Sequence, residues 1–120
     1  MINTRTHGII DYVTGALLLV APYLFGFANG GAAQWVPQLI GAVIIIMSLV
    51  TRYELSVAKV IPLKVHLGAD LVTGILLAVS PWLFGFASLI WWPHLLVGLL
   101  EIVVVALTKR DADTVGATRP

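Results

Sequence analysis

The sequence predicts an all-α integral membrane protein, a four-helix bundle made of two parallel two-helix repeats with both termini in the cytoplasm. Three observations predict this fold class. Hydrophobic residues make up 59% of the 120 residues and charged residues only 11%, whereas soluble domains carry about 25% charged residues. Residues 12–51 and residues 71–100 contain no Asp, Glu, Lys or Arg. The segment His7–Ala28 also recurs as His66–Ala87, with 14 identities in 22 positions.

Composition also excludes several classes of protein. The net charge is +1, and no basic run is present, so nucleic-acid binding has no electrostatic basis. The chain has no cysteine, which excludes thiol–disulfide chemistry, iron–sulfur clusters and thiolate zinc sites. The segments outside the apolar stretches are too short for a soluble domain, so residues 1–120 are expected to form a single membrane domain.

Hydropathy and the positions of Pro, Gly and charged residues predict four helices: Gly8–Phe27, Trp35–Thr51, His66–Phe86 and Trp92–Thr108. The first and third have about the 20 residues that a bilayer requires. The second and fourth have about 17, near the lower limit, and tryptophans at their beginnings suit the membrane–water boundary. Pro37 and Pro93 fall in the first turn of these two helices, where a missing N–H costs nothing.

The two repeats cover residues 7–54 and 66–111. Because each contains two spans, both must cross the membrane in the same direction, which predicts a pseudo-two-fold axis along the membrane normal. The basic residues all lie on one side of the predicted spans, and they set the orientation: Arg5, Arg52, Lys59, Lys64, Lys109, Arg110 and Arg119. The positive-inside rule puts that side, with both termini, in the cytoplasm.

The third predicted helix contains Ser80-Pro81-Trp82, within the segment Ser-Pro-Trp-Leu-Phe-Gly-Phe. This sequence resembles the SPW repeat family of small bacterial and archaeal integral membrane proteins, in which the motif lies in the first helix of each repeat. The first predicted helix carries the variant Ala21-Pro22-Tyr23, which keeps the proline and an aromatic residue and loses the serine. The resemblance implies a multi-pass protein of the prokaryotic cytoplasmic membrane and supplies no catalytic residues.

The two prolines interrupt predicted membrane helices. Pro22 removes the hydrogen bond to the carbonyl of Leu18, and Pro81 does the same at Leu77. In lipid, a freed carbonyl costs energy unless another group satisfies it. Two interpretations follow, a hinge or binding notch and a fixed kink that lets the aromatic segment fold over its short neighbour.

A His-x-x-x-Asp pair occurs in each repeat, as His7 with Asp11 and as His66 with Asp70. Residues four apart lie on one helix face, and Thr14 continues the first stripe. In a parallel repeat the stripes can meet near the cytoplasmic surface, where two histidines and two carboxylates are able to bind zinc, iron or manganese or to relay protons. The simpler interpretation is that each Asp is favoured by its helix dipole and hydrogen-bonds its neighbouring histidine. We expect no bound metal or other cofactor, and these four residues are the candidates if a metal is present.

Glu101 has no counterpart in the first repeat, where Ile44 takes its place. Its position predicts burial deep in the membrane, so the carboxyl group needs a partner, for which Thr14, Thr73 and Ser48 are candidates. Intramembrane carboxylates are often functional, and a structural hydrogen bond is the alternative.

These observations predict a non-enzymatic structural or interaction component of the bilayer that forms a homo-oligomer or joins a larger membrane complex. The first alternative is a minimal proton or cation transporter or channel subunit that uses Glu101 with Asp11 and Asp70. The second is a membrane metal site at the His/Asp pairs, or a quinone site lined by Tyr23–Phe27 and Trp82–Phe86. For these aromatic segments, an interface belt or helix packing is the simpler interpretation.

Overall fold

The computed structural model describes residues 2–51 and 55–108, and these residues form four α-helices: α1 (Thr4–Leu24), α2 (Ala32–Val50), α3 (Leu63–Leu83) and α4 (Trp92–Leu107). The first three are long and apolar enough to cross a membrane. The 21 residues of α1 or α3 rise about 31 Å, close to the hydrocarbon thickness of about 30 Å. Helix α4 has 16 residues and is shorter. The predicted all-α fold of four helices is confirmed for the described residues.

Three helices begin earlier than predicted. Helix α1 begins four residues before the predicted Gly8, because the Asn3 side chain caps its first turn by accepting a backbone N–H at 2.8 Å. Helix α3 begins three residues before the predicted His66. Helix α2 begins three residues before Trp35, whose N–H already bonds the Gly31 carbonyl at 3.0 Å. As a result, each His-x-x-x-Asp pair lies inside its helix and not at its edge.

Helices α1 and α3 also end earlier than predicted, three residues before Phe27 and Phe86. Two residues beyond each helix, Gly26 and Gly85 have φ +76°, a conformation that glycine adopts readily and that ends a helix. Helices α2 and α4 each end one residue before the predicted position. The predicted repeat boundaries at residues 54 and 111 lie outside the described residues.

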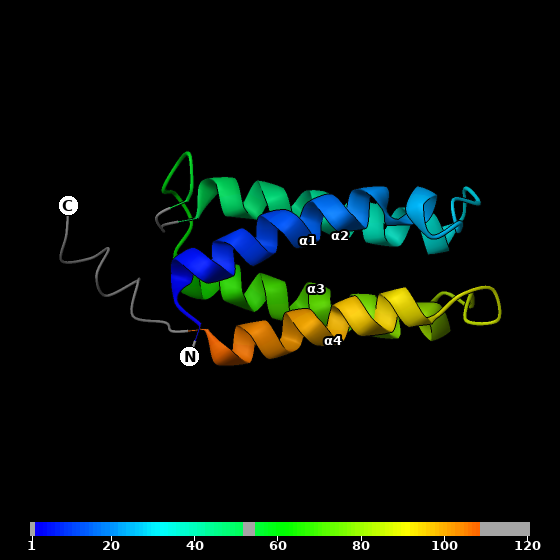
Figure 1. The fold of residues 1–120 in the computed structure, drawn as a ribbon. Coiled ribbons are helices and arrows are strands. Elements are labelled where there is room, and N and C mark those ends of the chain that lie inside the picture. The colour runs from blue at the N-terminus through cyan, green and yellow to red at the C-terminus, as the bar shows by residue number, and fades with distance from the viewer. Residues whose placement is uncertain (1, 52–54, 109–120) are drawn as a thin grey trace.

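The helices form two antiparallel hairpins, α1 with α2 and α3 with α4, which lie against each other (Figure 1). The beginnings of α1 and α3 and the ends of α2 and α4 gather at one end of the bundle, and the α1–α2 and α3–α4 connections lie at the other (Figure 1). We call these the cluster end and the loop end. The arrangement brings the polar residues early in α1 and α3 together.

Glycines allow the two helices of each hairpin to touch. A Cβ atom on Gly41 would lie 2.7 Å from the Gly15 carbonyl oxygen, and one on Gly98 would lie 2.6 Å from the Gly74 carbonyl oxygen. Such distances leave no room for any side chain. Both hairpins are therefore held by direct backbone contact, as is common between membrane helices.

The core between the hairpins is aliphatic at the middle of the bundle, and its buried members come from α1, α2 and α3: Leu18, Val36, Ile40, Ile44 and Leu77. The outward faces are apolar as well, because large side chains such as Val13 and Val72 are more than 60% exposed. In water such a surface would be unfavourable, whereas in a bilayer it contacts lipid tails.

Candidate functional site

The two His-x-x-x-Asp pairs meet at the cluster end of the bundle. The structure brings together His7 and Asp11 of α1 with His66 and Asp70 of α3, and we call these four residues the His/Asp cluster. All four are buried, with at most 2% of each residue exposed. One ligand-type atom from each lies within 4.8 Å of the other three. The two histidine rings meet edge to face, with centroids 5.7 Å apart.

Each histidine contacts both carboxylates. His7 Nε2 lies 2.8 Å from Asp70 Oδ2 and 3.0 Å from Asp11 Oδ2. His66 Nε2 lies 2.7 Å from Asp11 Oδ2 and 3.1 Å from Asp70 Oδ2. The four atoms thus form a closed ring in which nitrogen and oxygen alternate. Two of its four contacts run between α1 and α3, so the cluster joins the hairpins.

Two threonines hold the far sides of the histidine rings. His7 Nδ1 lies 2.7 Å from Thr108 Oγ1, at the end of α4, and His66 Nδ1 lies 2.7 Å from Thr51 Oγ1, at the end of α2. Both threonines are fully buried. Each histidine is therefore fixed from two sides, and every helix contributes to the site or to its support.

The hydrogen bonds determine which histidine nitrogens carry protons. The Thr51 hydroxyl donates to the Met47 carbonyl and the Thr108 hydroxyl to the Val104 carbonyl, so each Oγ1 accepts from a histidine Nδ1–H. Ionised carboxylates only accept, so each Nε2 must donate as well. With both carboxylates ionised, the His/Asp cluster holds two imidazolium ions and two carboxylates and has no net charge. Burial of charge is tolerated because each charge is paired and hydrogen-bonded.

The two threonines are the site residues that the sequence analysis missed. Thr51 and Thr108 match each other at an offset of 57 residues, and each precedes a basic residue. The sequence feature that could have identified them is a hydroxyl residue repeated at the predicted ends of the second and fourth helices. The offset differs from the 59 residues that relate the two His-x-x-x-Asp pairs, so the four segments could not be placed side by side from the sequence.

Thr73 and Glu101 meet beside the cluster, while Thr14 is buried one turn further along α1. The Thr73 hydroxyl lies 3.1 Å from the Asp70 carbonyl oxygen and 3.4 Å from Glu101 Oε2. Glu101 is only 3% exposed, and its Oε1 has no hydrogen-bond partner among the described residues. Of the three candidate partners for this carboxyl group, the structure selects Thr73.

The serine of the Ser-Pro-Trp motif compensates for the proline that follows it. Pro81 lacks the N–H that would bond the Leu77 carbonyl, and the Ser80 hydroxyl donates to that same carbonyl at 2.7 Å. Ser80 and Pro81 are both buried. In the first hairpin Pro22 is equally buried, but alanine stands in the serine position.

The aromatic residues of the two motifs lie on the outside of the bundle. Tyr23 is 66% and Trp82 55% exposed, and the Trp82 ring lies 6.4 Å from that of Trp91. This placement at the loop end suits an interface belt.

His94 occupies the interior of the loop end. Its Nε2 donates to the Ala33 carbonyl at 2.9 Å, which ties α4 to α2. The ring lies 5.1 Å from that of Phe27 and 4.8 Å from that of Phe86, which occupy matching positions of the two repeats. The neighbouring Trp92 and Pro93 predict that His94 is an interface residue at the outer surface. That prediction is wrong, because only 1% of His94 is exposed.

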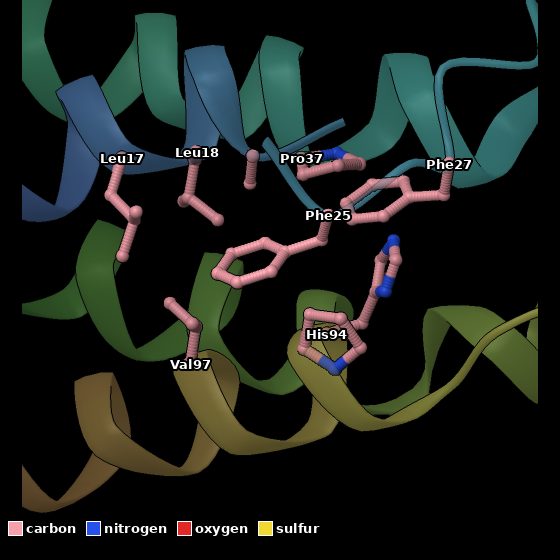
Figure 2. Close-up of a pocket in the computed structure, with 9 residues that line it drawn as sticks. Leu17, Leu18, Phe25, Phe27, Pro37, His94 and Val97 are labelled. Atoms are coloured by element: carbon pink, nitrogen blue, oxygen red, sulfur yellow. The ribbon is translucent and has the colours of Figure 1, made fainter. Parts of the chain in front are cut away.

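A small apolar cavity lies beside His94 (Figure 2). It measures about 20 Å³, room for about one water molecule, and is lined by Leu17, Leu18, Ala21, Phe25, Phe27, Pro37, Pro93, His94 and Val97. Ligand pockets measure about 300–1,000 Å³, so this cavity does not accommodate a quinone ring. The His/Asp cluster remains the site with the richest chemistry among the described residues.

No curated protein and no solved structure matches the chain. Residues 5–108 match the sequence model of the SPW repeat domain, a match that spans all four helices and both Pro-containing segments. The chain therefore belongs to the SPW repeat family.

Proposed function

We propose that the protein is a non-catalytic component of a prokaryotic cytoplasmic membrane, which acts by binding a second copy of itself or a larger membrane complex. The observation that carries this proposal is that the ring of the His/Asp cluster is closed. Both nitrogens of each histidine are engaged inside the bundle, so the polar groups hold the two hairpins together. The outward faces are apolar and offer contact with other membrane segments.

Cysteine crosslinking tests this association in native membranes. Because the chain has no cysteine, single-cysteine variants have no background. One exposed valine is available on each helix, giving Val13→Cys, Val43→Cys, Val72→Cys and Val103→Cys, and buried Val104 supplies the matched control Val104→Cys. We expect an oxidant to produce a crosslinked species with at least one exposed variant and none with the control.

The mass of the crosslinked species identifies the partner. Twice the mass of the chain indicates a homo-oligomer, and a larger defined mass indicates another membrane protein. If no exposed position crosslinks and the protein released in mild detergent is monomeric by native mass spectrometry, the proposal is contradicted.

As part of the same proposal, the two hairpins are parallel repeats, with both termini in the cytoplasm. The contact between His7 and His66 at the cluster end supports the parallel arrangement. Among the described basic residues, Arg5 and Lys64 lie in the first turns of α1 and α3, and Lys59 precedes α3. Basic residues favour the cytoplasmic side.

A membrane-impermeant maleimide tests the orientation. Ser88→Cys lies in the α3–α4 connection and Ala58→Cys in the α2–α3 connection, and both residues are exposed. In intact cells without an outer membrane barrier, we expect Ser88→Cys to react at once and Ala58→Cys only after permeabilisation. The opposite pattern, or equal labelling from one side, contradicts the orientation.

A proton or cation pathway that uses Glu101 with Asp11 and Asp70 is the second candidate. The observation that favours it is that Glu101 Oε1 has no hydrogen-bond partner within residues 2–51 and 55–108. The other carboxylate oxygen, Oε2, lies next to the Thr73 hydroxyl, which also contacts the Asp70 backbone. These contacts extend the polar region from the cluster end toward the middle of α4.

Flux in proteoliposomes tests this candidate. We expect the wild-type protein to dissipate an imposed proton or cation gradient and Glu101→Gln to abolish that flux while the protein stays folded. Ser48→Ala is the control, because Ser48 is also buried and its hydroxyl has no hydrogen-bond partner among the residues that the structure describes. Absence of flux in the wild type, or unchanged flux in Glu101→Gln, removes this candidate.

A further inference from the structure

We propose that the His/Asp cluster binds one divalent transition-metal ion, for which Zn²⁺ is the probe, through His7, Asp11, His66 and Asp70. This inference goes beyond the association proposed above and does not depend on it. Two imidazoles and two carboxylates form a donor set that zinc, iron and manganese accept. Each hairpin supplies one histidine and one carboxylate, so the site exists only when both hairpins are in place.

The donor atoms already surround a common point. The contacts between Nε2 and Oδ2 atoms measure 2.7–3.1 Å. Four ligands at about 2.1 Å from a tetrahedral ion lie about 3.4 Å apart. Each contact therefore needs to lengthen by about 0.3–0.7 Å for a tetrahedral site. The proposal assigns this change to rotation of the four side chains.

The supporting hydrogen bonds are those that a metal site needs. A histidine that binds a metal usually donates its other ring N–H to a fixed acceptor, which sets the tautomer and the ring orientation. Here Thr108 accepts from His7 Nδ1 and Thr51 accepts from His66 Nδ1, both at 2.7 Å. Both rings thus point Nε2 toward the centre. The threonines are positioning residues, because they act through the histidines.

Charge balance also favours a dication. With both carboxylates ionised, two Nε2 protons balance their charges in the metal-free cluster. A metal ion needs deprotonated imidazole nitrogens, so one M²⁺ replaces two protons and the site remains neutral. A neutral site matters within a membrane bundle, where an unbalanced charge is costly. The other elements that face the cluster add the hydroxyls of Thr51 and Thr108, and Glu101 of α4 approaches through Thr73.

Metal titration of the full chain in mild detergent tests the proposal. The protein carries an affinity tag without histidine, is stripped with a chelator, and is titrated with Zn²⁺ against a fluorescent zinc indicator. We expect one Zn²⁺ per chain and the release of about two protons per ion in weakly buffered solution. If no Zn²⁺ binds, or if Zn²⁺ binds without releasing protons, the proposal is overturned.

The chain offers a matched histidine control. His94→Gln changes an equally buried histidine at the loop end and is expected to keep one Zn²⁺ per chain. His7→Gln and His66→Gln are each expected to lose it, while Thr51→Val and Thr108→Val weaken the affinity about 10–100-fold. If His7→Gln and His66→Gln bind zinc as the wild type does, the ion lies elsewhere and the proposal is wrong.

X-ray absorption of the zinc-loaded wild type tests the site without any variant, so poor folding of a variant does not decide the outcome. We expect four nitrogen or oxygen ligands at about 2.0–2.1 Å, with outer-shell scattering from two imidazole rings. Scattering from no imidazole, or from only one, overturns the assignment. Because this readout is independent of crosslinking, failure of the metal site and failure of self-association are distinguishable.

Discussion

His7 Nε2 lies closer to Asp70 of the other hairpin, at 2.8 Å, than to Asp11 of its own helix, at 3.0 Å. The same holds for His66, which lies 2.7 Å from Asp11 and 3.1 Å from Asp70. The exchange of partners converts two pairs that are local in sequence into one connection between α1 and α3. It gives the cluster end of the bundle a polar link where the neighbouring core is aliphatic.

Neutralising one carboxylate of the His/Asp cluster should strongly destabilise the protein. Asp11→Asn leaves a buried imidazolium without full charge compensation, a defect that costs about 3–5 kcal/mol. The free energy of unfolding, measured by reversible denaturation in mixed micelles, should fall by that amount. Asp11→Asn combined with His66→Gln should cost less than the sum of the two single changes, because the residues are in contact. Additive losses, or a loss near zero for Asp11→Asn alone, contradict the paired-charge arrangement.

The two threonines should contribute equally. Thr51→Val and Thr108→Val each leave a histidine Nδ1–H without its acceptor, so we expect each to lower the free energy of unfolding by about 1–3 kcal/mol. Thr51→Ser and Thr108→Ser keep the hydroxyl and serve as controls with smaller losses. A loss at only one of the two positions would show that the histidines are supported differently in the two hairpins.

The serine of the Ser-Pro-Trp motif should be transferable between the hairpins. Ser80→Ala removes the donor to the buried Leu77 carbonyl and should cost about 1–3 kcal/mol of unfolding free energy. Ala21→Ser places a hydroxyl in the same position before Pro22 and should stabilise the protein, by about 0.5–1.5 kcal/mol. Thermal unfolding of the two variants beside the wild type measures both effects. A destabilising Ala21→Ser would mean that the first hairpin satisfies its freed carbonyl in another way.

Because the backbones touch within each hairpin, we expect alanine substitution to destabilise the protein at Gly98 but not at Gly68. Gly98→Ala puts a methyl group 2.6 Å from backbone atoms of α3, and we expect overpacking to cost about 1–3 kcal/mol. Gly68→Ala is the matched control, because no atom of the described residues lies within 4 Å of its added methyl group. That change should be neutral or stabilise the helix by up to about 1 kcal/mol. Equal effects of the two substitutions on the unfolding midpoint would contradict the close approach of α3 and α4.

Glu101 should reduce stability in the wild type. Its Oε1 is buried and has no hydrogen-bond partner in the part of the chain that the structure describes, and the first repeat has Ile44 at the matching position. Glu101→Ile is therefore expected to raise the free energy of unfolding by about 1–3 kcal/mol, while Glu101→Gln, which remains polar, should gain little. A clear loss of stability with Glu101→Ile would show that the carboxyl group makes a structural bond that outweighs its burial.

The sequence by itself determined the apolar character of the chain and its four helices. It also showed that one His-x-x-x-Asp pair occurs in each of two similar segments. The physical reason is that lipid imposes a constraint on every residue of a spanning segment. Helices of about 20 apolar residues satisfy it, and charged residues are rare in them because their burial in lipid is costly. The hydropathy of the sequence therefore reveals a spanning segment without any knowledge of tertiary contacts. Helix boundaries were less accurate, because the cap at Asn3 and the left-handed glycines Gly26 and Gly85 depend on local backbone conformation.

Only the tertiary structure decided which polar groups meet. The spacing of four residues paired His7 with Asp11, yet the shorter contact crosses to Asp70. Thr51 and Thr108 match each other at an offset of 57 residues, whereas the two histidines match at 59. The sequence therefore did not show which histidine each threonine supports. Glu101 had three possible partners, and the structure places Thr73 against it. These pairings depend on how α1 and α3 rotate about their own axes, and that rotation is set by the backbone contacts at the glycines and by the packing of the aliphatic core.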